Sequence, residues 1–141
     1  MCDRHRFDGK PVTLAVVDID HFKRINDQYG HQTGDIVLVE VAKTMRTRLR
    51  PTDFIARFGG EEFVMIFPQT SLAGAAVAAE RLREAVRLTR VKTRDGMQIP
   101  SATVSIGLAE LQPGQDVASL LQLADEALYR AKHNGRNRVE S

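Results

Sequence analysis

The sequence predicts an α+β fold in which helices flank a central antiparallel sheet. Three observations support this prediction. An apolar run rich in valine ends in acidic residues at 12–20, two short apolar runs flank a glycine pair within 54–67, and three longer segments carry apolar residues at helical spacing. Apolar residues three and four positions apart indicate a helix with one buried face, whereas short continuous or alternating runs indicate strands.

The first third of the chain predicts one buried strand and two helices. "VTLAVVDID" at 12–20 is almost continuously apolar, which is typical of a central strand covered on both faces. A short helix over 21–29 should end at Gly30, because glycine is favoured just beyond a helix end. A second helix is expected over 35–48, and Pro51 prevents its continuation.

The middle of the chain predicts a hairpin followed by a helix. "FIARF" at 54–58 and "EFVMIF" at 62–67 flank Gly59 and Gly60, which is the pattern of a tight β-hairpin. The apolar residues over 72–86 then fall on one helical face.

The last third predicts a strand, a helix and a short edge strand. A small hairpin is expected around 95–96, and the alternating segment 101–111 predicts a strand. Asp116 should cap a final helix that ends at Gly135, and "NRVE" at 137–140 is expected to add an edge strand.

The order of these elements contains the split β-α-β arrangement of ferredoxin-like folds. Such a sheet places the first strand beside the hairpin. We therefore expect Asp18, at the end of the first strand, to lie next to Glu61 and Glu62 at the start of the hairpin's second strand.

The composition is that of one globular domain covering 1–141. The chain has 141 residues, 43% of them apolar and 27% charged, with a formal net charge of +2. So small a charge gives no indication of nucleic-acid binding, and no run of about 18 apolar residues predicts membrane insertion. A single cysteine excludes disulfides within the chain, and we expect a cytoplasmic protein.

The clustered carboxylates predict a metal site. Acidic groups that converge at one rim repel each other unless a cation pairs with them, and oxygen ligands suit Mg²⁺. A lysine between Asp18 and Glu61 would argue against this interpretation. For Asp20 we expect instead that the side chain caps the next helix.

The same fold also hosts RNA-recognition modules, which carry a basic–glycine–aromatic strand motif similar to "RFGGEEFVMIF" at 57–67. Here Glu61 and Glu62 would face the RNA and repel its phosphates. This alternative is therefore weaker.

Three segments together resemble one family. "GGEEF" at 59–63 resembles the signature of the GGDEF family of diguanylate cyclases, in its form with a second glutamate. "DIDHFKRINDQYGHQTGD" at 18–35 and "ADEALYRAKHNGRN" at 124–137 resemble two further conserved segments of that family. The resemblance covers roughly residues 12–140 and implies a fold similar to nucleotidyl cyclases and polymerase palm domains.

The resemblance implies that two GTP molecules are joined into cyclic di-GMP with release of two pyrophosphates. It implies two Mg²⁺ ions in each half-site, with Mn²⁺ as an alternative, held by Asp18, Glu61, Glu62 and the backbone carbonyl of Ile19. Glu61 would also help to deprotonate the ribose 3′-hydroxyl. Because each domain binds one GTP, activity would require a two-fold pair of domains.

The resemblance also assigns residues to the nucleotide and to an inhibitory product site. Taken alone, the same residues fit ordinary helix-face, helix-end and turn positions. Asn26 and Asp35 would recognise guanine, and the product site would bind cyclic di-GMP. The remaining contacts to GTP would come from Phe22, Lys23, Gly59, Gly60, Lys132 and Arg136, and the product site would comprise Arg50, Asp53 and Arg81.

The family usually carries a further segment before its first strand and a sensory or receiver domain upstream. Only about eleven residues precede the strand here, and we expect residues 1–11 to be a flexible N-terminal remnant. An alternative to an active cyclase is a silent module that binds GTP or cyclic di-GMP. Altered carboxylates would favour it, and the sequence has none.

Overall fold

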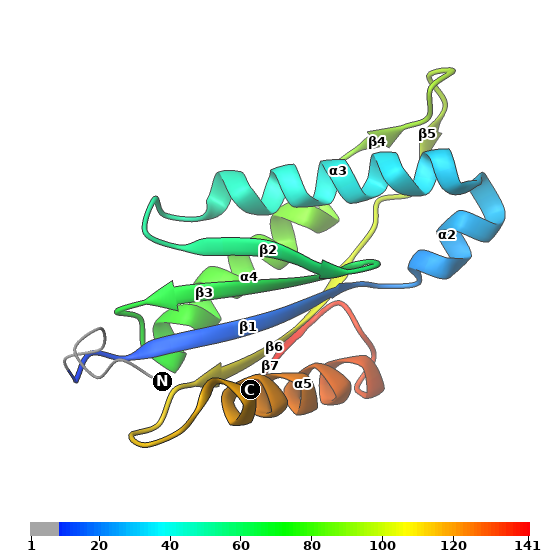
Figure 1. The fold of residues 1–141 in the computed structure, drawn as a ribbon. Coiled ribbons are helices and arrows are strands. Elements are labelled where there is room, and N and C mark those ends of the chain that lie inside the picture. The colour runs from blue at the N-terminus through cyan, green and yellow to red at the C-terminus, as the bar shows by residue number, and fades with distance from the viewer. Residues whose placement is uncertain (1–8) are drawn as a thin grey trace.

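The structure is a computed structural model that describes residues 9–141 (Figure 1). The prediction of a flexible remnant over 1–11 therefore falls largely outside the described residues. In chain order the elements are β1 (Val12–Ile19), α2 (Phe22–Tyr29), α3 (His31–Arg48), β2 (Phe54–Gly59), β3 (Glu62–Pro68), α4 (Leu72–Arg87), β4 (Val91–Lys92), β5 (Gln98–Ile99), β6 (Val104–Glu110), α5 (Val117–His133) and β7 (Val139–Glu140).

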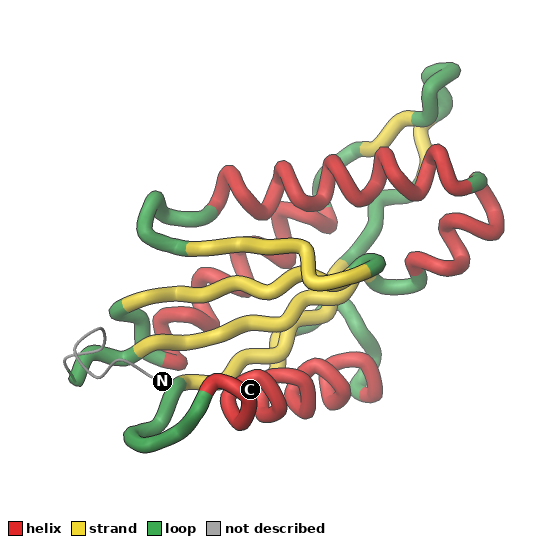
Figure 2. The backbone as a smooth tube through the Cα atoms, viewed as in Figure 1, coloured by secondary structure: helices red, strands yellow, loops and turns green. Residues whose placement is uncertain are grey.

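The main sheet has the strand order β2-β3-β1-β6-β7. Every neighbouring pair is antiparallel except β6 and β7, which run parallel. The α+β class, the central antiparallel sheet and the adjacency of the first strand and the hairpin are thus confirmed. The small hairpin β4–β5 is also confirmed, and it stands apart from the main sheet beside the N-terminal part of α3 (Figure 2).

Alternate residues of β1 pack into two separate cores. Ala15, Val17 and Ile19 belong to the larger core, which α2, α3 and α4 complete. Leu14 and Val16 belong to the smaller core under α5. The strand is covered on both faces, as its continuous apolar run predicts.

Helix α5 packs closely on β6 because one position there lacks a side chain. A Cβ added to Gly107 would lie 2.2 Å from the backbone oxygen of Ala124 and 2.2 Å from the backbone nitrogen of Leu128. The predicted cap is confirmed, since the Asp116 side chain accepts a hydrogen bond from Ser119 N–H at 2.8 Å.

The predicted start of the second helix is wrong by four residues. Helix α3 begins at His31 rather than at Asp35, and Gly30 alone separates it from α2. Gly30 makes this sharp junction possible with a φ of 89°, which favours glycine. The added turn contains no apolar side chain, so periodicity gives no sign of it, although Thr33 and Gly34 are buried.

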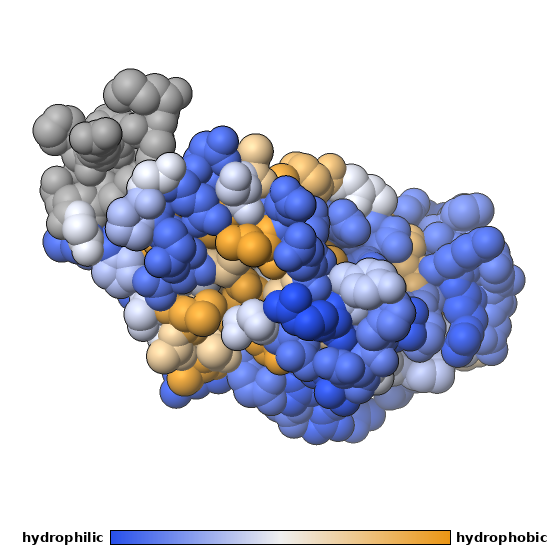
Figure 3. Space-filling model, turned by 90° about the horizontal axis from the view of Figure 1, so that it is seen from below, coloured by the Kyte–Doolittle hydropathy of each residue, from blue (hydrophilic) through white to orange (hydrophobic). Residues whose placement is uncertain are grey.

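The surface on the α5 side of the molecule carries both polar and hydrophobic residues (Figure 3). Polar residues dominate this view, with hydrophobic groups exposed between them. Exposed apolar side chains of α5 include Val117, Leu123 and Tyr129. Among residues 9–141, no helix combines the length and hydropathy needed to cross a membrane.

Candidate active site at the end of the central strand

The predicted carboxylates meet where β1 ends and β3 begins. Asp18 lies directly opposite Glu62 in the antiparallel register. The backbone N–H of Ile19 donates to the carbonyl oxygen of Glu61 at 3.3 Å. The sheet therefore gathers Asp18, Glu61 and Glu62 at one rim, which confirms the expected adjacency.

The Asp18 side chain is buried, and one of its two carboxylate oxygens has a partner. Only 5% of this residue is exposed. Its Oδ2 forms an ion pair with Nζ of Lys132, which reaches it from α5. Its Oδ1 is buried and has no hydrogen-bond partner among residues 9–141. A lysine does approach Asp18, which the sequence analysis named as an argument against a metal site, but it pairs with Oδ2 alone and leaves Oδ1 unpaired among the described residues.

The electrostatics of this rim favour an additional cation. Burial raises the pKa of Asp18, the hydrogen bond and charge of Lys132 oppose that rise, and the charge of Glu61 adds to it. Burial likewise raises the pKa of Glu62, and the charge of Asp18 raises it further. One lysine thus compensates the carboxylates only in part, and more positive charge would stabilise their ionised forms.

The donor set fits a metal that brings other ligands with it. Within the described range 9–141, no group of three His, Cys, Asp or Glu side chains could hold a metal ion by itself. Mg²⁺ commonly takes one or two carboxylates and completes its shell with substrate phosphates and water. The unpaired Oδ1 of Asp18, at the same rim as Glu61 and Glu62, suits an ion that binds together with a nucleotide.

The prediction that Asp20 caps a helix is wrong. His21 occupies the N-cap position of α2, and that helix has no side-chain cap. Asp20 is instead turned into the protein, where its Oδ1 accepts from the Ser105 hydroxyl at 2.6 Å and its Oδ2 from the Thr103 hydroxyl at 2.7 Å. The backbone N–H of Asn137 donates to the same Oδ2 at 3.0 Å. Three donors that are distant in sequence outweigh a local cap.

The glycine turn leaves its backbone accessible. A Cβ added at Gly59 or Gly60 would meet nothing within 4 Å. Gly60 has a φ of 50°, and its carbonyl oxygen accepts from Nε of Arg57 at 2.9 Å. The open space here agrees with the close approach of a ligand that the glycine pair suggests.

The predicted guanine residues lie on α2 and α3, the two helices that follow β1. Phe22 packs into the core with 8% exposure, and Lys23 is exposed on the same helix. The Oδ1 of Asn26 is buried and has no hydrogen-bond partner in the part of the chain that the structure describes. Asp35 is exposed on α3, which packs against α2. The unsatisfied amide oxygen of Asn26 is suited to a polar ligand.

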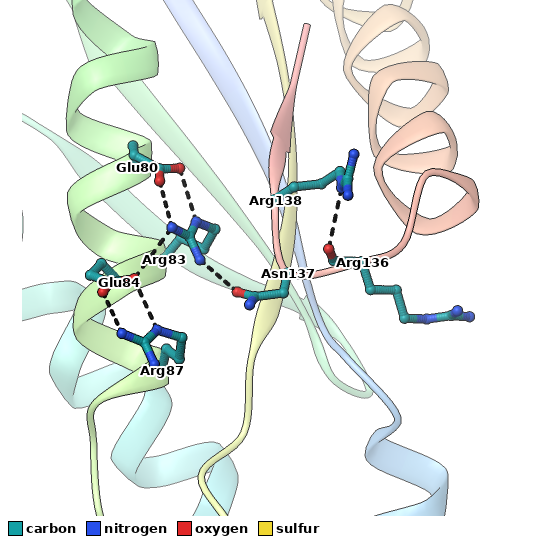
Figure 4. A network of polar contacts seen from close by, with 7 residues as sticks. All are labelled: Glu80, Arg83, Glu84, Arg87, Arg136, Asn137 and Arg138. Atoms are coloured by element: carbon teal, nitrogen blue, oxygen red, sulfur yellow. Dashed lines mark hydrogen bonds and ion pairs between the residues drawn. The ribbon is translucent and has the colours of Figure 1, made fainter.

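The turn after α5 carries the second predicted phosphate residue. Arg136 is exposed, has a φ of 62°, and donates its backbone N–H to the carbonyl oxygen of Ala131 at 2.9 Å. Its side chain extends away from α4 (Figure 4). Lys132 and Arg136 therefore come from one helix end, as predicted.

The predicted product site lies at the other end of β3. Arg50 and Asp53 form an ion pair at 3.1 Å, with side-chain exposures of 56% and 3%. Arg50 also donates to the carbonyl oxygen of Pro68 at 3.2 Å and to the Thr70 hydroxyl at 2.6 Å. Arg81 is exposed on α4. The guanidinium of Arg50 is thus oriented and accessible.

A family comparison matches nearly the whole chain. Residues 2–138 match the family described as "Diguanylate cyclase, GGDEF domain". The chain belongs to the GGDEF family. This GGDEF domain therefore has the palm-like cyclase fold that the resemblance implies.

Three related proteins are similar to this domain over nearly its whole length. The domain is 48% identical over 137 residues to diguanylate cyclase DgcP of Pseudomonas aeruginosa, covering 97% of this chain but 20% of that protein. The GGDEF domain of DgcB from Caulobacter crescentus, solved in complex with c-di-GMP, has a TM-score of 0.93 and 44% identity, with coverage of 99% of this chain and 82% of that chain. An active GGEEF domain of a diguanylate cyclase from Vibrio cholerae has a TM-score of 0.87 and 34% identity, with coverage of 97% and 86%.

Sequence reasoning missed three features of this site. The ion pair of Lys132 with Asp18 joins residues 114 positions apart, since 132 − 18 = 114. Gly34 makes room for the Asn26 side chain, and Asn137 connects Asp20 to α4. The only sequence signal was the position of Gly34 and Asn137 inside family-like segments, because neither has chemistry of its own.

Proposed function

We propose that this GGDEF domain is a diguanylate cyclase that condenses two GTP molecules into cyclic di-GMP and two pyrophosphates. The observation that carries the proposal is the buried Asp18, which has one carboxylate oxygen without a partner among the described residues and lies at the same rim as Glu61 and Glu62. The similarity to an active GGEEF domain and to a domain solved with c-di-GMP supports the choice of substrate and product.

The metal ligands would be Asp18, Glu61, Glu62 and the backbone carbonyl of Ile19. Two Mg²⁺ ions in each half-site, or Mn²⁺ in their place, would neutralise phosphate charge and make the ribose 3′-hydroxyl more acidic. Glu61 accepts the 3′-hydroxyl proton. The 3′-oxygen then forms a bond to the α-phosphorus, and the bond from that phosphorus to pyrophosphate breaks.

The proposed nucleotide contacts are those that the family resemblance implies. Asn26 and Asp35 face the guanine edge, where a carboxylate accepts from the N1–H and N2–H₂ donors that adenine lacks as a pair. Lys132, which pairs with Asp18 in this structure, would contact phosphate. The other contacts are packing by Phe22, charge from Lys23 and Arg136, and backbone approach at Gly59 and Gly60.

Two domains are needed for each product molecule. Each 3′-oxygen attacks the α-phosphorus held by a second domain, so a two-fold pair with facing sites forms the working unit. Holding two bound nucleotides in this orientation supplies most of the rate enhancement.

The primary test is incubation with GTP and Mg²⁺, followed by detection of cyclic di-GMP and pyrophosphate. We expect product from the wild-type domain and loss of at least ~100-fold in turnover from Glu61→Gln. Glu126→Gln is the matched control, because Glu126 is exposed on α5 and is not among the proposed metal or nucleotide residues. Absence of product at high protein concentration, even with enforced dimerisation, would refute the proposal.

We further propose that product inhibits the enzyme at Arg50, Asp53 and Arg81. The guanidinium of Arg50 can stack on guanine or bind its O6 and N7 atoms. Arg50→Ala should remove tight binding of cyclic di-GMP while sparing initial turnover, and Arg46→Ala is the matched control on α3. Unchanged inhibition in Arg50→Ala would contradict the assignment.

A silent module that binds GTP or cyclic di-GMP is the second candidate. The ion pair of Lys132 with Asp18 favours it, because the lysine already neutralises a proposed metal ligand. Nucleotide binding without any product would identify this function. The domain spans 20% of the length of DgcP. We therefore propose that a sensory or receiver domain accompanies it in a longer cytoplasmic protein.

A further inference from the structure

Asn137 connects the turn after α5 to two other elements. Its side-chain Oδ1 accepts a hydrogen bond from Nη1 of Arg83 on α4 at 2.7 Å (Figure 4). Its backbone N–H donates to Oδ2 of Asp20, just beyond β1, at 3.0 Å. We call Arg83, Asn137 and Asp20 the Asn137 bridge.

Both ends of the Asn137 bridge are fixed. Arg83 is 14% exposed in its side chain, and its guanidinium donates to Glu80 at 2.9 Å and to Glu84 at 3.3 Å. Asp20 is 5% exposed and holds the two hydroxyl donors described above. Asn137 is therefore tied to anchors that cannot easily move.

The turn that the Asn137 bridge holds has an unfavourable backbone. Gly135, Arg136 and Asn137 have φ values of 121°, 62° and 49°. Left-handed backbone is unfavourable for residues with a side chain, and asparagine tolerates it better than most. Such conformations persist where surrounding contacts hold them, and they concentrate at functional sites.

The held turn determines where two cations lie. Lys132 is in the last turn of α5, and Arg136 directly precedes Asn137. Asp20, the anchor, is two residues from Asp18, to which Lys132 is paired. The Asn137 bridge thus sets the position of the helix end that bears Lys132 and Arg136 relative to the strand end that bears Asp18.

We propose that Asn137 is a positioning residue that, through Arg83 and Asp20, holds Lys132 and Arg136 toward the phosphates of a nucleotide bound beside Asp18. The inference rests on the proposed function, because it concerns the same site. It predicts that loosening the Asn137 bridge weakens nucleotide binding more than it slows the chemical step, since the phosphate charges are already present in bound GTP.

The decisive variant is Asn137→Gly. Glycine keeps the left-handed backbone and the N–H to Asp20 but removes the acceptor for Arg83. We expect KM for GTP to rise about five- to tenfold with kcat within about twofold of wild type. Asn137→Asp retains an acceptor oxygen and should restore the wild-type KM. A merely structural role would lower the unfolding midpoint and the active fraction without this change in KM.

Changes at Arg83 provide an independent check with a matched control. Arg83→Met removes the donor to Asn137 and should raise KM like Asn137→Gly. Arg87→Met is the control, because Arg87 lies one turn further along α4 and pairs with Glu84 rather than Asn137 (Figure 4). Equal KM values for Arg83→Met and Arg87→Met would overturn the proposal.

Titration calorimetry with a non-hydrolysable GTP analogue and Mg²⁺ separates this inference from the proposed turnover. Weaker binding by Asn137→Gly but not by Asn137→Asp supports the inference even if the wild-type domain makes no cyclic di-GMP. Wild-type affinity in Asn137→Gly overturns it even if turnover is confirmed. A wild-type domain that binds no analogue and makes no product overturns both.

Discussion

At the scale of single residues, Gly34 controls the space available to Asn26. A Cβ at Gly34 would lie 1.7 Å from Oδ1 of Asn26, so Gly34→Ala must displace that side chain. We predict that Gly34→Ala raises KM for GTP about tenfold, because the displaced amide no longer meets guanine. Steady-state kinetics across a range of GTP concentrations provide the measurement.

The fold should tolerate this substitution. The obstructing atoms at Gly34 belong to side chains, and alanine in a helix interior is favoured over glycine by about 0.5–1 kcal/mol. Gly74→Ala is the matched helical control. A Cβ at Gly74 would lie 3.3 Å and 3.6 Å from two side-chain atoms, neither of which belongs to a proposed nucleotide residue. A wild-type KM in Gly34→Ala would show that Asn26 does not contact the base.

The residue scale also shows what the sequence could predict about the site. Asp18, Glu61 and Glu62 were predicted to meet, because their strand ends follow from pattern and topology. The hydrogen bonds of Asp20 and the ion pair of Lys132 with Asp18 were not, because their partners are more than 80 residues away in the sequence. Local rules assign an acidic residue after a strand to a helix cap, and only the tertiary structure shows three better donors.

At the scale of elements, the contact between α5 and β6 depends on Gly107. A Cβ there would meet backbone atoms of α5 at 2.2 Å, and backbone cannot rotate away as a side chain can. We predict that Gly107→Ala lowers the free energy of unfolding by about 1–3 kcal/mol or more. Urea denaturation followed by circular dichroism measures this loss, with Gly74→Ala as the control. Wild-type stability of Gly107→Ala would contradict the close packing of α5.

The cap of α5 predicts a dependence of stability on pH. The backbone N–H of Ser119 holds the pKa of the Asp116 carboxyl below its ordinary value. A group whose pKa is lowered in the folded state contributes stability above its unfolded pKa and loses it as pH falls through the folded one. The unfolding midpoint of Asp116→Ala should therefore lie below wild type at pH 7.

The difference between Asp116→Ala and wild type should shrink as pH falls below about 3.9, the ordinary aspartate pKa. Asp116→Asn is the matched control, because asparagine also caps helices but does not titrate there. Thermal unfolding from pH 7 to pH 3 provides the measurement. A difference between alanine and wild type that stays constant over this range would show that the charge of Asp116 contributes nothing.

Elements were predicted well where an apolar pattern marks them. The stripe of α4 and the valine run of β1 set their positions, since burial selects those residues. The first turn of α3 was not predicted, because it follows Gly30 directly and its buried residues are threonine and glycine. A helix start that depends on backbone geometry rather than on apolar side chains gives no periodic hydrophobic signal in the sequence.

At the scale of the whole molecule, β3 separates the two proposed sites. Glu62 begins this strand beside Asp18, and Pro68 ends it beside Arg50. A strand of this length extends about 20 Å at ~3.4 Å per residue. The carboxylate rim and the product site are thus far enough apart for Arg50→Ala to change inhibition without altering the metal ligands.

If two domains are required, turnover per domain depends on protein concentration. For an enzyme that is active as a monomer it does not. If each product needs a facing pair, dilution below the dissociation constant of the pair removes the second GTP from reach. We predict that turnover per domain falls about in proportion to protein concentration in that range. Fusing a parallel two-stranded coiled coil to the N-terminus should hold turnover per domain constant on dilution.

Assays over a 100-fold dilution series, with and without the fused coiled coil, measure this dependence. The same fusion carrying Glu61→Gln is the control, because it dimerises but lacks the proposed base. Turnover per domain that stays constant on dilution of the unfused chain, with the chain monomeric by light scattering, would contradict the paired mechanism. Since the fusion alters no residue of the carboxylate rim, any gain it gives can be attributed to proximity between two nucleotides.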